Sequence, residues 1–185
     1  MISALLVARG PAVFDAGSMT DQAAGITGFN ALSNAAATDA LLACCASPAL
    51  AREVLAGRPY RSADDLYATA DAVLAALPEE DIDRAVAGHP RIGGRTDNVA
   101  SAREQSGVAA ATDAVRSALA EGNRAYEQRF GHRYLVCATG RTGAELLDLL
   151  TTRLHNDPAT ERAVMRTELA RINRIRLRRM LEGLA

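Results

Sequence analysis

Three side chains in this sequence could together transfer a proton and bind an anion: His89, Glu104 and Arg176. An imidazole exchanges protons near neutral pH, and a carboxylate accepts hydrogen bonds from N–H groups. A guanidinium holds two oxygens of an anion in a planar fork. We therefore take these residues as the candidate catalytic set of an enzyme that positions a small anionic substrate.

His89 follows Gly88, which ends a predicted helix, and opens a glycine-rich loop over residues 89–100. The negative end of a helix favours the protonated imidazole, so this position suits proton transfer. We expect His89 to be partly exposed in a pocket. The alternative is a structural histidine that bonds the last carbonyl groups of the helix.

Glu104 lies in the stretch Ser101-Ala-Arg-Glu104-Gln105, at the start of a predicted helix. A serine followed three residues later by glutamate is the signature of a capping box, which is the structural interpretation. The functional interpretation is that the carboxylate and the N–H groups of the helix start bind an anionic or amide-bearing ligand.

The last predicted helix carries an apolar stripe formed by Met165, Leu169, Ile172 and Met180. Arg176 stands in this stripe, where an apolar residue is expected. A buried guanidinium must be paired, either with a ligand carboxylate or with an acidic side chain such as Glu104. A third interpretation is a side chain that snorkels to the surface. If Arg176 shares a cavity with His89, this helix packs against the loop after residue 88.

Other polar motifs give weaker signals. The stretch from Arg141 to Gly143 resembles a short glycine-rich loop, but it lacks the G-x-G-x-x-G pattern of a nucleotide site. His132 and His155 have no metal-ligand spacing with each other or with His89, so we expect surface or packing residues. We predict no metal site.

The composition excludes several classes of protein. The 185 residues are 49% hydrophobic, which predicts one domain with a sizeable core. The formal net charge of -1 is spread along the chain and predicts neither a nucleic-acid nor a membrane partner. The sequence contains no lysine, which excludes pyridoxal phosphate enzymes, class I aldolases and P-loop proteins.

The cysteines and the N-terminal residues indicate where the protein works. Cys44, Cys45 and Cys137 are odd in number and lack the spacing of a zinc or redox motif, which predicts a reducing compartment and hence the cytoplasm. No basic region precedes the apolar residues 1–7, so no signal peptide is expected. We expect residues 1–28 to form a flexible extension and residues 29–185 to form one helical domain.

Most segments combine a capping residue, apolar positions three and four apart, and a final glycine, asparagine or proline. This pattern predicts an all-α, compact, single-domain bundle of about eight helices without significant sheet. The predicted helices are 35–46, 48–56, 63–77, 79–87, 102–110, 112–130, 143–155 and 158–182. Residues 133–138 would suit a strand, but one strand has no partner, so we expect an extended or helical segment.

A series of short motifs runs from Phe29-Asn30 to the C-terminus. They are Phe29-Asn-Ala-Leu-Ser33, Arg58-Pro-Tyr60, His89-Pro-Arg-Ile-Gly93, Ser101-x-x-Glu-Gln105, Asn123-x-x-Tyr-x-x-x-Phe-Gly131, Tyr134-Leu-Val-Cys137, Gly140-Arg141, Arg153-Leu-x-Asn156 and Ile172-x-x-Ile-Arg-Leu177. Each motif is modest alone, but their order and spacing together resemble the 2-oxo-4-hydroxy-4-carboxy-5-ureidoimidazoline (OHCU) decarboxylases.

The resemblance implies an all-helical enzyme, usually a homodimer, that decarboxylates this ureidoimidazoline to (S)-allantoin in urate degradation. It implies no metal and no organic cofactor. It also implies that His89 is the catalytic acid/base, beside Glu104 and Arg176. The implied substrate-binding set is Pro90, Ser101, Glu104, Gln105, the main chain of Val136, Cys137, Ala138, Thr139 and Gly140, and Arg176.

The implied chemistry agrees with the lysine-free sequence. The substrate carries its carboxylate and hydroxyl on one ring carbon, next to a C=N bond that can accept the electrons released with CO2. Arg176 would hold an oxygen, Glu104 would accept N–H groups, and His89 would manage the hydroxyl proton or protonate one face. Two alternatives from other classes remain: a binding module for a ureide or purine catabolite, and a helical interaction protein in which the three residues are structural.

Overall fold

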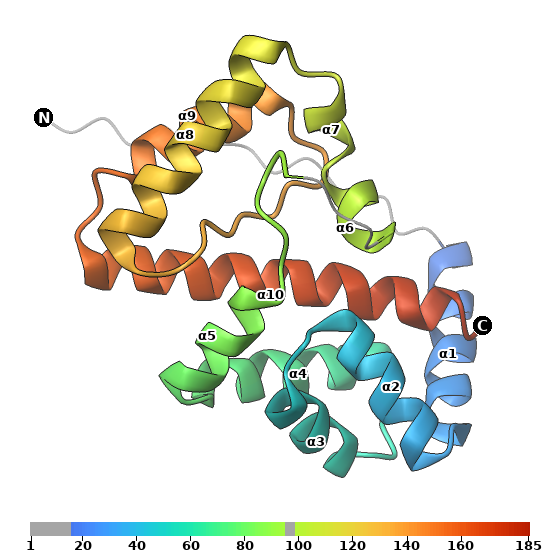
Figure 1. Cartoon of the computed structure of the whole chain (residues 1–185). Coiled ribbons are helices and arrows are strands. Elements are labelled where there is room, and N and C mark those ends of the chain that lie inside the picture. The colour runs from blue at the N-terminus through green and yellow to red at the C-terminus, as the bar shows by residue number, and fades with distance from the viewer. Residues whose placement is uncertain (1–15, 95–98) are drawn as a thin grey trace, which may run out of the picture.

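The computed structural model describes residues 16–94 and 99–185, and these residues form helices and no strand (Figure 1). The predicted all-α fold is therefore confirmed. The elements are α1 (Ala16–Ala31), α2 (Asn34–Cys44), α3 (Pro48–Ala56), α4 (Ala63–Ala76), α5 (Glu79–Ala87), α6 (Val99–Glu104), α7 (Ser106–Ala109), α8 (Asp113–Phe130), α9 (Gly143–Arg153) and α10 (Pro158–Glu182). In these ranges no helix is long and apolar enough to cross a membrane.

Side-chain caps explain why most helix starts were predictable. In each case a hydroxyl or carboxylate oxygen before the helix accepts an N–H of the first turn, which otherwise has no partner. The capping residues are Ser33, Ser47, Ser62, Thr112, Thr142 and Asp157. The predicted helix 102–110 is wrong in its bounds. Helix α6 begins earlier, and a turn at Gln105 separates it from α7.

Helix α1 was not predicted. Residues 16–28, which the sequence analysis assigned to a flexible extension, form most of this helix, and residues 1–15 lie outside the described part of the chain. Its glycines lower helix propensity, which hides the helix in the sequence. A Cβ at Gly25 would lie 2.3 Å from the carbonyl oxygen of Leu181, and one at Gly28 would lie 2.4 Å from that of Leu184. The glycines therefore let α1 pack closely against the end of α10.

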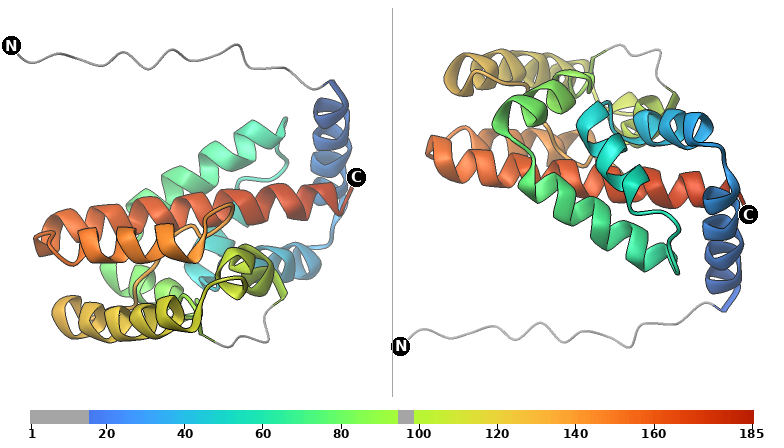
Figure 2. Two further views of the ribbon diagram at one scale, coloured as in Figure 1. Left: turned by 90° about the horizontal axis from the view of Figure 1, so that it is seen from above. Right: turned by 90° about the horizontal axis from the view of Figure 1, so that it is seen from below.

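Helix α10 runs the length of the helical body, as the views in Figure 2 show. On one side, α1 to α5 share one apolar core with α10, which contains Phe29, Leu66 and Leu169. On the other side, a second core is built largely from α8 and α9 and contains Leu119 and Leu146. The segment at 133–138 is extended and contributes to both cores, with Leu135 in the first and Val136 in the second.

Candidate active site

The candidate residues meet at the boundary between the two cores. The loop after α5 brings His89, α6 brings Glu104, and the middle of α10 brings Arg176 to one small cavity. The cavity is lined by His89, Pro90, Ile92, Ser101, Glu104, Gln105, Leu135, Val136, Ala138, Ile172 and Arg176. The predicted convergence of the last helix with the loop after residue 88 is therefore confirmed.

Arg176 and Glu104 form a two-pronged ion pair. Arg176 Nε donates to Glu104 Oε1 at 2.9 Å, and an η nitrogen donates to Oε2 at 2.8 Å. Both side chains are 9% exposed, so the arginine does not snorkel to the surface. The same guanidinium also donates to Ser101 Oγ and to the carbonyl oxygen of Cys44, each at 3.2 Å. Of the three interpretations, pairing with the acidic side chain of Glu104 is the one that the structure shows, and the fork of Arg176 is engaged within the protein.

The structural interpretation of Ser101 and Glu104, a capping box, is wrong. Ser101 lies inside α6 rather than before it, and Glu104 is buried against Arg176. A complete capping box occurs instead at Thr142 and Glu145, where each side chain bonds the other residue's backbone N–H. The two glutamates share a sequence signature, and tertiary contacts with α10 decide which one caps a helix.

His89 is buried, with 5% of its surface exposed, so the expectation of partial exposure was wrong. Its Nδ1 lies 2.8 Å from the carbonyl oxygen of Ala85 in the last turn of α5. The carbonyl can only accept, so Nδ1 carries the proton and Nε2 carries the lone pair. Nε2 has no hydrogen-bond partner within the described ranges. The histidine thus caps the helix, as the alternative predicted, and keeps its second nitrogen available.

Burial lowers the pKa of His89, and the nearby cations Arg176 and Arg133 lower it further. The hydrogen bond to Ala85 and the charge of Glu104 act in the opposite direction and do not compensate. The expectation that the helix end keeps this imidazole protonated was therefore wrong. Loss of hydration outweighs the hydrogen bond to the helix end, and at neutral pH the side chain is a neutral base.

Several bonds fix the loop that carries His89. Arg91 binds both carboxylate oxygens of Glu127 at 2.7 Å. The carbonyl oxygen of Ile92 accepts Asn123 Nδ2 at 2.9 Å, and Gln105 Oε1 accepts the backbone N–H of Gly93 at 2.9 Å. Gln105 therefore holds the loop in addition to lining the cavity. Because Asn123 and Glu127 stand one turn apart on α8, this helix supports the loop at Arg91 and Ile92.

Some predicted substrate-binding residues do not line the cavity, namely Cys137, Thr139 and Gly140. The backbone of Cys137 is held by Glu168 and Arg141, at 2.8 and 3.2 Å. Three lining residues were missing from the prediction: Ile92, Leu135 and Ile172. Ile172 could have been found, because it lies one helical turn before Arg176 on the same face.

The remaining histidines and the cysteines do not line the cavity. His132 packs against the rings of Tyr126 and Phe130, and His155 is exposed, as expected for packing and surface residues. Burial raises the pKa of the Cys44 thiol to about 12, which makes it a poor nucleophile at neutral pH. Among residues 16–94 and 99–185, no three His, Cys, Asp or Glu side chains gather as metal ligands would.

Comparison with known sequences gives consistent matches. Residues 30–178 match the family model described as OHCU decarboxylase. A curated protein of Amia calva, 2-oxo-4-hydroxy-4-carboxy-5-ureidoimidazoline decarboxylase, is 31% identical over 144 residues, which cover 73% of this chain and 81% of the relative. The uric acid degradation bifunctional protein TTL of Arabidopsis thaliana is 31% identical over 77% of this chain. This chain spans about half of that longer relative, 46% of its length.

Comparison with solved structures also gives matches. A crystal structure of OHCU decarboxylase in the presence of (S)-allantoin has a TM-score of 0.69 and 28% identity, covering 76% of this chain and 95% of the solved one. A crystal structure of (S)-allantoin synthase has a TM-score of 0.66 at 18% identity, covering 84% of this chain and 53% of that one. The second likeness supports the fold alone.

Proposed function

The chain belongs to the OHCU decarboxylase family, and we propose that it converts 2-oxo-4-hydroxy-4-carboxy-5-ureidoimidazoline to (S)-allantoin and CO2. The observation that carries this proposal is the buried Nε2 of His89, on a side chain that lines a cavity beside the Arg176–Glu104 pair. A buried polar atom without a protein partner lowers the stability of the fold. Helix capping by Nδ1 does not require Nε2 to be left without a partner. A proton-transfer role accounts for it.

The name of the substrate defines the chemistry that the site must support. Carbon 4 of the ring carries the carboxylate and the hydroxyl, and carbon 5 carries the ureido group. When the bond to the carboxylate breaks, its electron pair forms a double bond between carbons 4 and 5. The former C=N pair moves to the ring nitrogen, which takes up a proton from solvent. Loss of the hydroxyl proton and protonation of carbon 5 then give allantoin. The electrons remain in the ring, so no lysine Schiff base is required.

We assign the hydroxyl proton and the proton for carbon 5 to His89. The neutral imidazole, held through Nδ1 on Ala85, offers the Nε2 lone pair as the base. After accepting the hydroxyl proton it becomes an imidazolium that can donate from one fixed direction. Delivery from one direction would protonate carbon 5 on a single face and produce one enantiomer.

Arg176 and Glu104 are proposed to bind the substrate as a pair. Glu104 occupies the fork of Arg176, so a substrate oxygen reaches the guanidinium when the carboxylate shifts. The shifted carboxylate can then accept N–H groups of the ring or the ureido group. The cavity measures about 20 Å³, room for roughly one water molecule, so its walls must move apart when the substrate binds.

The test is an assay with substrate generated enzymatically in the cuvette. Release of CO2 and the circular dichroism of the allantoin are followed together, and we expect fast CO2 release with (S)-allantoin as the product. Racemic allantoin formed at the uncatalysed rate would contradict the proposal. Thermal stabilisation by (S)-allantoin without turnover would indicate a binding module, and neither stabilisation nor turnover would indicate an interaction protein.

We further propose that the protein is a cytoplasmic homodimer. The family resemblance supports the dimer, and three cysteines without a disulfide support a reducing compartment. Light scattering after size-exclusion chromatography measures the mass of the assembly. A mass close to 19.5 kDa, that of one chain, would contradict the dimer.

A further inference from the structure

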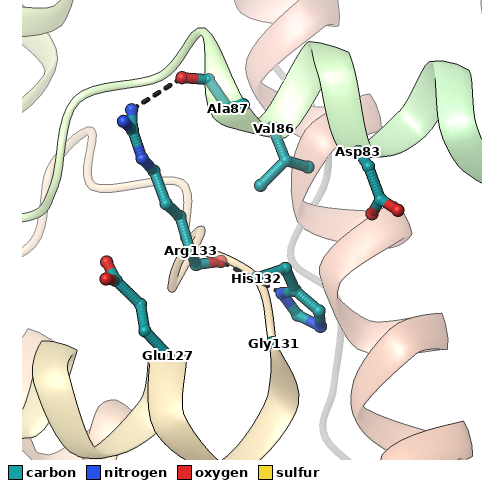
Figure 3. Close-up of a pocket in the computed structure, with 7 residues that line it drawn as sticks. All are labelled: Asp83, Val86, Ala87, Glu127, Gly131, His132 and Arg133. Carbon is teal, nitrogen blue, oxygen red and sulfur yellow. Dashed lines mark hydrogen bonds between the residues drawn. The ribbon is translucent and has the colours of Figure 1, made fainter.

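Arg133 lies outside the cavity but holds the backbone that carries His89. Its Nη1 donates to the carbonyl oxygen of Ala87 at 2.6 Å and to that of His89 at 2.7 Å. Figure 3 shows the guanidinium reaching from the segment after α8 to the end of α5, with the first of these bonds dashed. Arg133, which is 44 positions from His89 in the sequence, therefore binds the carbonyl groups of Ala87 and His89 on both sides of the turn at the end of α5.

These two carbonyl groups have few other partners available. The last carbonyls of a helix lack intrahelical N–H partners. In α5, the carbonyl of Val86 accepts the backbone N–H of His89, and that of Ala85 accepts the imidazole. Arg133 donates hydrogen bonds to the carbonyl groups of Ala87 and of His89 itself. The backbone on both sides of the His89 Cα is thus held, by its own N–H on one side and by Arg133 on the other.

The charge of Arg133 acts on the same imidazole. Three charged side chains influence His89: Arg176 from α10, Glu104 from α6 and Arg133 from the segment after α8. The two arginines lower its pKa and the glutamate raises it. Arg133 therefore helps to keep the imidazole neutral while contributing no atom to the cavity lining.

We propose that Arg133 is a positioning residue, which orients His89 through the two carbonyl groups so that its Nε2 stays directed for proton transfer. This inference rests on the proposed function of His89. The outer side of Arg133 borders a second, open cavity of about 330 Å³, which Asp83, Glu127 and His132 also line (Figure 3). Because Arg133 is half-buried rather than part of a core, its replacement should leave the fold intact.

The kinetic test compares Arg133→Met with Arg133→Lys. We expect kcat of Arg133→Met to fall about tenfold with KM within twofold, because misorientation of a catalytic group slows the reaction without weakening binding. The acid limb of its kcat–pH profile should move to higher pH, since removal of a cation raises the pKa of His89. Lysine keeps the charge, so its acid limb should stay in place and its kcat should recover in part. Arg124→Met, at an exposed arginine of α8, is the control for loss of one surface charge.

A spectroscopic measurement separates this inference from the proposed function. Nitrogen-15 NMR of the His89 imidazole reports its tautomer and its titration without turnover. Arg133→Met should raise the titration midpoint, and Arg124→Met should not. If Arg133→Met does not fold, Arg133→Gln, which keeps a donor but removes the charge, replaces it. Absence of turnover by the wild-type protein would overturn only the proposed function. An unchanged His89 titration together with an unchanged kcat in Arg133→Met would overturn the role of Arg133.

Discussion

Two buried arginine–glutamate pairs lie along α10, and they differ in their surroundings. The first, the core pair, joins Arg153 at the end of α9 to Glu161 at the start of α10, with side chains 7% and 0% exposed. The second, the cavity pair, joins Arg176 and Glu104, each 9% exposed. The two pairs are alike in burial, although Glu104 Oε1 of the cavity pair also accepts a hydrogen bond from a second arginine, Arg179, at 3.4 Å.

The core pair is saturated by protein groups. Arg153 donates to the carbonyl oxygen of Leu135 at 2.8 Å and lies over the ring of Tyr134 at 4.8 Å. Glu161 accepts hydrogen bonds from Arg153, from the Tyr126 hydroxyl and from Asn156. This network joins the ends of α8, α9 and α10. It satisfies the carboxylate of Glu161 with protein donors.

The cavity pair has a cavity and the lone pair of His89 Nε2 beside it. A buried ion pair is weak evidence for function, because structural pairs of the same type also occur. The cavity distinguishes the cavity pair from the core pair, because a buried atom without a partner occurs beside both: Tyr134, whose ring lies against Arg153, also has an unpartnered hydroxyl. The following predictions test that distinction, beginning with the largest effect.

Replacement of His89 should have the largest effect on activity. His89→Asn keeps an N–H for the Ala85 carbonyl but removes the base, so we expect kcat to fall by about 10² to 10⁴ while the protein remains folded. His155→Asn is a matched control, because His155 Nδ1 bonds the carbonyl of Thr151 in the same i−4 geometry, at 2.8 Å, on the surface. Near-normal allantoin formation by folded His89→Asn would remove the acid/base assignment.

Disruption of the core pair should cost stability instead of activity. Arg153→Met leaves the buried charge of Glu161 without its main partner, and we expect a loss of about 3–5 kcal/mol in the free energy of unfolding. Urea titration at pH 7 measures it. At a temperature where the variant is folded, kcat/KM should equal that of the wild type. A normal urea midpoint with low kcat/KM would reverse the roles of the two pairs.

Arg176→Lys should lower kcat/KM by about 10- to 100-fold with a smaller change in stability, since a hydrogen bond to a charged group contributes about 1.5–3 kcal/mol. Lysine keeps the charge and loses the planar fork. Arg153→Lys is the matched change in the core pair and should leave kcat/KM unaltered. If Arg176→Met combined with Glu104→Gln kept its activity, the cavity pair would also be structural.

The smallest effect concerns the dependence of stability on pH. The pKa of His89 is lowered in the folded protein, whereas in the unfolded chain it lies near 6.5. Below that pH the unfolded chain takes up a proton that folded His89 does not, so stability falls as pH decreases toward the folded pKa. The slope for one group is at most about 1.4 kcal/mol per pH unit. Urea titrations of wild type and His89→Asn from pH 7.5 to 5.5 should differ in this slope, and identical slopes would mean that the pKa is not lowered.

Local sequence signals account for the parts of the fold that were predicted. Helix starts such as those at Ser47 and Asp157 depend on a side chain and an N–H two or three residues away, so they are visible in the sequence. Helix α1 was hidden because Gly25 and Gly28 are unfavourable locally and become useful only against α10.

The sequence by itself determined the helical class, most helix bounds and the identity of His89, Glu104 and Arg176 as candidates, because each rests on residue type and near-neighbour spacing. Tertiary structure alone decided that Glu104 pairs with Arg176 instead of capping a helix, that His89 is buried and neutral, and that Arg133 holds its backbone. Burial and charge–charge distance depend on segments 44 to 72 residues apart in the chain. Short-range sequence patterns do not predict such distances, because the packing of the helices around α10 sets them.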